Sequence, residues 1–117
     1  MFSILSLSLL STACLFHKKS AYTFPATFTK DQKEKTTVFC DKGKVLYDVN
    51  CAKCHNTVVK GKQVIPDFPA NKLESYKLRF ISPVHDSSMR RTNISMDELL
   101  FITTYLTYKK KNPTPKK

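Results

Sequence analysis

The pattern of apolar and polar positions predicts helices, with no alternation that would indicate strands. From about Thr37 to Asn50, apolar or small residues recur at the spacing of one helical face. These residues are Phe39, Gly43, Leu46 and Tyr47. A glycine inside a helix costs about 1 kcal/mol relative to alanine. Gly43 therefore predicts that another helix approaches closely at a residue without a Cβ.

A short second helix is predicted from about Lys72 to Phe80, between loops at residues 56–71 and 81–94. The last helix is predicted to follow Ser95, because Ser95 and Glu98 form the S-x-x-E capping box.

The last helix is predicted to run to about Tyr108, with a wide apolar face. That face includes Leu99, Phe101, Ile102, Tyr105, Leu106 and Tyr108. Asn112 and Pro113 end the pattern, and the lysines at 109–111 suit the negative end of the helix dipole.

Composition favours one small all-α domain. The chain has 117 residues, no Trp and only two Gly, so its core is modest and the domain would be marginal alone. The formal charge of +11 suits an acidic protein partner or an anionic membrane, or reflects only a solvated lysine surface. Nucleic acid is not expected, since no stacking or helix-turn-helix module accompanies the lysines.

The N-terminus has the features of an export signal. Residues 2–16 are apolar but shorter than the ~20 residues of a spanning helix. The stretch 10–14 resembles a bacterial lipobox, which implies a periplasmic or extracytoplasmic protein anchored to the membrane by a lipidated Cys14. An ordinary signal peptide and an uncleaved anchor are the alternatives. Beside an uncleaved anchor, His17, Lys18 and Lys19 would favour a cytoplasmic location for the rest of the chain.

Pro25 and a run of charges break the periodicity after this signal, which predicts a tether. Tyr22, Phe24 and Phe28 are unusual for a linker and could instead lie on the domain surface. The predicted division is a signal peptide at 1–14, a tether at 15–36, a helical domain at 37–110 and a basic tail at 111–117.

The strongest chemical signal is the motif C-x-x-C-H at Cys51, Cys54 and His55, which is typical of c-type haem attachment. One helical turn presents both thiols to the two vinyl groups on one edge of the porphyrin. The imidazole of His55 follows directly and can take an axial position on iron. The motif therefore predicts one covalently bound haem c.

Two alternatives use the same cysteines. A zinc site could add Cys40 with His17 or His85, but no second C-x-x-C or H-x-x-x-H follows. A thioredoxin-like dithiol would need a βαβ context, and the pattern shows none. If Cys14 is lipidated, Cys40 has no partner and is expected to be a small buried residue.

The order of these features closely resembles the small mono-haem cytochromes c of class I over about residues 37–110. The resemblance implies that the first and last helices cross, with Gly43 and Tyr47 against Tyr105 and Leu106. It also implies that the Pro66 carbonyl accepts a hydrogen bond from the free ring N–H of His55.

The resemblance further implies Met89 as the second axial ligand, shortly before the last helix. Met96 and His85 are the competing ligands: Met96 is tied to the first helical turn, and His85 would give bis-histidine ligation.

The expected function is one-electron transfer between membrane or periplasmic redox partners with acidic docking surfaces, without catalysis, since both axial positions would be filled. The alternatives are a haem-binding sensor with an open or labile distal site and a zinc-binding interaction module.

Overall fold

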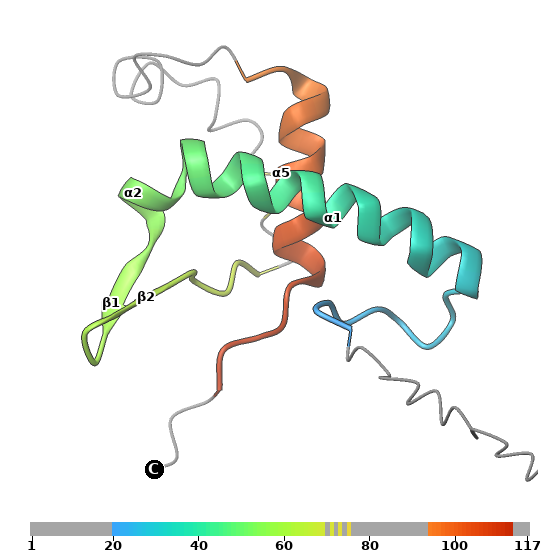
Figure 1. Ribbon diagram of the computed structural model, residues 1–117, viewed down its shortest axis with the longest axis horizontal. Helices are drawn as coiled ribbons and strands as arrows, with labels where there is room; N and C mark the ends of the chain where they lie inside the picture. The colour runs from blue at the N-terminus through green and yellow to red at the C-terminus, as the bar shows by residue number, and fades with distance from the viewer. Residues whose placement is uncertain (1–19, 70, 72, 74, 76–93, 114–117) are drawn as a thin grey trace, which may run out of the picture.

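This computed structural model describes residues 20–69, 71, 73, 75 and 94–113. Its elements, in chain order, are helix α1 (Lys30–Asn50), helix α2 (Ala52–His55), strands β1 (Thr57–Val59) and β2 (Lys62–Val64), and helix α5 (Met96–Tyr108). Figure 1 shows α5 crossing α1 transversely near the middle of α1, with α2 and the two strands continuing from the end of α1.

The crossing of α1 and α5 is centred on Gly43, as the sequence predicts. A Cβ placed on Gly43 would lie on the carbonyl oxygen of Phe101, 2.5 Å from the carbonyl carbon and 2.9 Å from Tyr105 Cβ. Only a residue without a side chain lets the two backbones come this close.

The core forms around this crossing. Its buried members are Tyr22, Cys40, Tyr47, Leu73, Ile102, Tyr105 and Leu106. On α1 the buried face runs through Cys40, Gly43 and Tyr47. Phe39, predicted on that face, is instead 42% exposed, and its ring meets Phe101 edge-on at 5.1 Å.

Helix α1 begins at Lys30, earlier than the predicted Thr37. Thr29 caps it: the Gln32 N–H donates to Thr29 Oγ1 at 3.2 Å, and Gln32 Oε1 accepts from the Thr29 N–H at 2.8 Å. This T-x-x-Q capping box starts the helix inside the charge run that suggested a tether.

The tether prediction is wrong for the described residues of 15–36. Tyr22 is buried in the core, and its hydroxyl donates to Asp41 at 2.5 Å. The Thr23 N–H donates to the Tyr108 carbonyl at 2.8 Å. Phe24 also packs on Tyr108, with ring centroids 5.3 Å apart. Aromatic burial and this backbone bond hold the segment against α5.

Helix α5 has the predicted limits and the predicted cap. The Ser95 N–H donates to Glu98 Oε2 at 2.8 Å, and the Glu98 N–H donates to Ser95 Oγ at 3.1 Å. Lys109 follows the helix directly, at its negative end. It is only 7% exposed, and its ammonium donates to Asp67 Oδ1 at 2.5 Å.

A two-stranded antiparallel hairpin follows α2, so the fold is mostly helical but not all-α. Val58 pairs with Gln63, and the turn residues Lys60 and Gly61 have φ angles of 50° and 75°. Two left-handed residues suit a tight hairpin turn. The loop prediction missed these strands because they are short and β1 is exposed throughout, which leaves no alternation to detect.

Asn71, Leu73 and Ser75 have helical backbone, and Leu73 joins the core. The rest of the helix predicted over 72–80 lies outside the described residues. In the part of the chain that the structure describes, no helix has both the length and the apolar character needed to cross a membrane.

Candidate functional site

The C-x-x-C-H residues occupy one helical turn, as predicted. Cys51 ends α1, where its N–H donates to the Tyr47 carbonyl at 2.8 Å. The Cys51 carbonyl then accepts from the N–H groups of Cys54 at 3.2 Å and of His55 at 2.9 Å. Two thiols and an imidazole thus come from a single turn that continues directly from the long helix.

The three side chains differ in burial. Cys51 is half-buried, whereas Cys54 and His55 are exposed. Loss of solvation, with a smaller contribution from Cys54, raises the pKa of the Cys51 thiol to about 11. Cys51 is therefore protonated at neutral pH. Both cysteines are free thiols.

The turn is fixed to the core through Tyr47. The Tyr47 ring is buried against Tyr105, with centroids 6.1 Å apart, and its hydroxyl donates to Asn56 Oδ1 at 2.9 Å. The Asn56 N–H donates back to the Ala52 carbonyl at 2.9 Å. Sequence reasoning placed Tyr47 at the crossing but missed its bond to Asn56, because no short motif links them.

An aromatic side chain lies beside the turn. The ring of Phe68 lies 6.3 Å from the His55 ring, and Ile65 and Phe68 both pack on the core. Pro66, between them, is half-buried. Its hydrogen bond to His55 stays a prediction. The contact of Phe68 with His55 was not foreseen, since Phe68 lies in a segment read only as a proline loop.

The segment with Pro66 is clamped to the end of α5 by Asp67. Asp67 Oδ1 accepts from Lys109 Nζ, and Asp67 Oδ2 accepts from the Asn112 N–H at 2.9 Å. The Asn112 side chain also donates to the Ile65 carbonyl at 2.9 Å. These contacts fix the residues on either side of Pro66.

The other candidate ligands have separate positions. Met89, His85, His17 and Cys14 lie outside the described residues. Met96 is 62% exposed on the first turn of α5. Cys40 is fully buried, with its Sγ 3.8 Å from the Thr104 carbonyl oxygen, which confirms its expected role as a small core residue.

Among the described residues, no group of three or more His, Cys, Asp or Glu is arranged to hold a metal ion. The described residues place two thiols and one imidazole on one turn, with the Phe68 ring beside the His55 ring.

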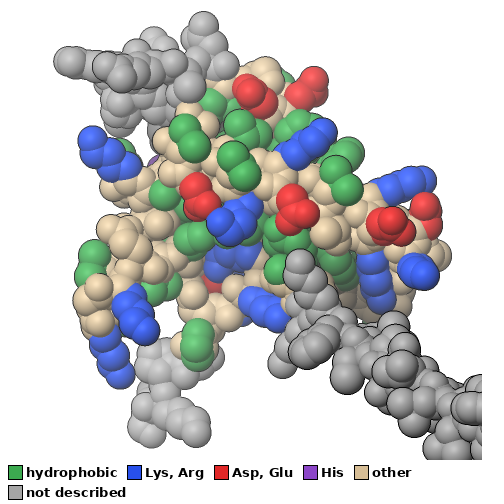
Figure 2. Space-filling view, in the orientation of Figure 1, with side chains coloured by type: hydrophobic (Ala, Val, Ile, Leu, Met, Phe, Trp, Pro, Cys, Tyr) green, Lys and Arg blue, Asp and Glu red, His purple; other side chains and the backbone are tan. Residues whose placement is uncertain are grey.

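Basic and apolar side chains share the surface next to the turn. Lys53 lies within it, and Lys60 and Lys62 lie on the hairpin that follows, all exposed. Val58 and Val59 of β1 are also exposed. Figure 2 shows hydrophobic and basic side chains side by side on the hairpin, whereas acidic and basic side chains alternate over α1.

Comparison of the chain with protein-family models, with curated proteins and with solved structures found no match.

Proposed function

We propose that this protein is a one-electron carrier with the cytochrome c fold, holding one covalent haem c. The observation that carries the proposal is the single turn that presents Cys51, Cys54 and His55 together and is fixed to the helix crossing through Tyr47. The spacing of these residues suits two thioether bonds and one axial bond to iron.

The described residues fit this group. Cys51 and Cys54 would hold it by thioethers, and His55 would bind the iron. When bound, haem c supplies reversible one-electron chemistry between ferric and ferrous iron. Phe68 limits the orientations open to the His55 ring. The Pro66 carbonyl would fix the imidazole further by accepting its second N–H.

The helix crossing supports the fold part of the proposal. Gly43 and Tyr47 on α1 meet Tyr105 on α5, and Leu106 is buried in the same core. The resemblance to class I cytochromes c implies this pairing of the first and last helices.

The proposal extends to the partner and the location. Lys53, Lys60 and Lys62 give the surface beside the turn a positive charge, which suits redox proteins with acidic docking surfaces. We place the protein outside the cytoplasm, anchored to the membrane by a lipid on Cys14, on the basis of its lipobox-like N-terminus.

Haem attachment is tested by expressing the full chain with haem-attachment machinery. We expect a pyridine haemochrome spectrum of a c-type haem, retained after denaturation and acid extraction. Cys51→Ala and Cys54→Ala should yield little stable holoprotein, because each removes a thioether. Cys40→Ala is the matched control, since it removes a buried thiol away from the motif, and it should retain haem. Wild-type protein without covalent haem would refute the proposal.

The second axial ligand is tested by the ferric sulfur-to-iron charge-transfer band. Met89→Ala should abolish this band and let the reduced protein bind CO, whereas Met96→Ala and His85→Ala should do neither. Loss of the band in Met96→Ala would transfer the role to Met96. Rapid CO binding by the reduced wild-type protein would instead favour a sensor with an open distal site.

A further inference from the structure

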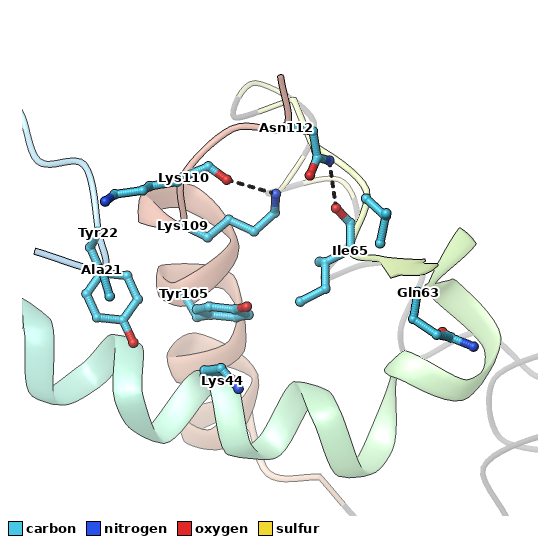
Figure 3. Close-up of a pocket in the computed structure, with 10 residues that line it drawn as sticks. Ala21, Tyr22, Lys44, Gln63, Ile65, Tyr105, Lys109, Lys110 and Asn112 are labelled. Carbon is cyan, nitrogen blue, oxygen red and sulfur yellow. Dashed lines mark hydrogen bonds between the residues drawn. The ribbon is translucent and has the colours of Figure 1, made fainter. Parts of the chain in front are cut away.

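The segment before α1 brings a tyrosine, Tyr22, against the helix crossing. Its ring is only 7% exposed and meets the Tyr105 ring edge-on, with centroids 6.4 Å apart. Figure 3 shows the two rings beside each other, with the Tyr22 hydroxyl directed at α1. There the hydroxyl donates to Asp41 Oδ1 at 2.5 Å. A bond of this length from a hydroxyl to a carboxylate is a strong, charge-assisted one.

The two members of this pair differ in exposure. The Tyr22 ring is buried, whereas Asp41 is exposed on α1. Asp41 can therefore exchange a proton with water while the ring beside it stays covered. Tyr47 is the useful comparison, because its hydroxyl donates to the side-chain amide of Asn56, which is not a base. Tyr22 thus has a proton acceptor of a kind that Tyr47 does not have in Asn56.

The resting state of Tyr22 is the protonated phenol. Burial, the hydrogen bond to Asp41 and the negative charge of Asp41 all raise the pKa of Tyr22 above its ordinary value. Simple deprotonation at neutral pH is therefore unfavourable. A phenol that loses an electron becomes a strong acid, however, and a carboxylate already bonded to it can then take the proton.

The composition and the ring contacts favour such an oxidation at a tyrosine. The chain has five Tyr and no Trp, so tyrosines are its most easily oxidised aromatic side chains. Three of them form a row through the crossing: Tyr47 and Tyr105 have ring centroids 6.1 Å apart, and Tyr105 and Tyr22 follow at 6.4 Å. An electron can pass along rings this close, and Tyr22 is the member of the row that donates to a carboxylate.

We propose that Tyr22 is a redox-active tyrosine, which gives one electron to a small diffusing radical while Asp41 takes its proton. The O–H bond of Tyr22 breaks, the proton forms an O–H bond with Asp41 Oδ1, and the electron reduces the radical to its anion. The product is a neutral tyrosyl radical whose buried ring cannot readily couple with a second radical. Neither residue belongs to the turn at 51–55, so the proposal does not depend on haem.

The test is pulse radiolysis of the full-length protein in azide solution, with the azide radical as the one-electron oxidant. Electron paramagnetic resonance of rapidly frozen samples should detect a persistent tyrosyl radical, and Tyr22→Phe should lose it. Asp41→Asn keeps a hydrogen-bond acceptor but removes the base. Radical formation should then be about a hundredfold slower, the lower end of what a positioned base contributes. Asp41→Glu restores a carboxylate and should recover the faster rate.

The matched controls are Tyr108→Phe and Asp48→Asn. Tyr108 is another tyrosine near the same segment, and Asp48 is an exposed carboxylate of α1 that pairs with Lys44. Both variants should keep the wild-type signal and rate. If thermal unfolding shows that Tyr22→Phe is destabilised, Asp41→Asn and Asp41→Glu decide the outcome. Absence of a persistent tyrosyl signal, its survival in a stably folded Tyr22→Phe, or equal slowing in Asp41→Asn and Asp48→Asn would overturn the proposal.

Discussion

The helix crossing and the cysteine turn lie in adjacent parts of one chain but are built by different means. At the crossing, the backbones of α1 and α5 touch at Gly43, and Cys40, Tyr47 and Ile102 are almost fully buried. At the turn and hairpin, Cys54, His55 and both valines of β1 are exposed. The first region is held by side-chain packing, and the second by backbone hydrogen bonds and a few anchors.

This difference separates the residues that pack the core from those whose side chains stay exposed. The turn depends on the crossing through Cys51, which continues α1, and through the bond from Tyr47 to Asn56. The exposed side chains of the turn, Cys54 and His55, are not part of the core at the crossing. Substitutions in the two regions should therefore have very different effects on stability and on chemistry.

The largest effect is expected from Gly43→Ala. The new Cβ would meet the Phe101 carbonyl, a backbone group that cannot move aside as a flexible side chain could. Overpacking of this kind costs about 3 kcal/mol, more than the gain in helix propensity from alanine. Denaturant unfolding measures the difference.

The control for this prediction is Gly61→Ala in the hairpin. Gly61 has a φ of 75° and open space around it, so only backbone strain of about 1 kcal/mol is expected. If Gly61→Ala destabilised the protein as much as Gly43→Ala, the hairpin would contribute to global stability as strongly as the crossing does.

The crossing was largely predictable from sequence because its constraints are local. Gly43 is anomalous within a helix, Tyr47 follows one turn later, and Ser95 with Glu98 fixes the start of α5. The one-turn geometry of the C-x-x-C-H motif was predictable for the same reason. A capping box and a C-x-x-C-H spacing are both defined by residues that lie close together in the sequence.

The features that the sequence did not predict depend on contacts between distant residues. Nothing near Tyr22 shows that it pairs with Asp41, and nothing near Asp67 shows that it binds Lys109. The start of α1 is a different case, since Thr29 and Gln32 match the capping box pattern. The run of charged residues at 30–35 suggested a tether, and this capping box was therefore overlooked.

A smaller effect is expected from Asp67→Asn, which breaks the clamp between the segment at Pro66 and the end of α5. The substitution leaves the buried Lys109 ammonium without its ionic partner, and burial prevents water from replacing that partner. Asp67 itself is partly exposed. We expect a loss of about 2 kcal/mol, between the values for exposed and buried pairs. Asp48→Asn, which breaks the exposed pair with Lys44, is the control and should cost about 0.3 kcal/mol.

The pH dependence sharpens this prediction. Burial opposes the ionisation of Asp67, but hydrogen bonds from Lys109 and Asn112 and the charges of Lys109 and Lys111 outweigh it and lower the pKa. The folded state therefore keeps Asp67 ionised at a lower pH than the unfolded chain does. The stabilisation is present above about pH 4 and is lost as pH falls through the lowered pKa. A difference from Asp67→Asn that persisted undiminished at pH 2 would contradict this account.

The smallest effect on stability is expected from the double substitution Lys60→Gln and Lys62→Gln on the hairpin. Both side chains are exposed, so the free energy of unfolding should change by less than about 0.5 kcal/mol. The rate of electron transfer to an anionic oxidant should change more, since these charges lie on the hairpin that follows the proposed haem-attachment turn. With ferricyanide as the oxidant, we expect about a threefold lower rate constant at low salt, a difference that disappears as salt screens the charges. Lys33→Gln with Lys35→Gln removes the same charge from the first part of α1, beyond the crossing, and should leave the rate constant near the wild-type value. An equal decrease in both double variants would mean that only the net charge matters and that the hairpin is not a docking surface.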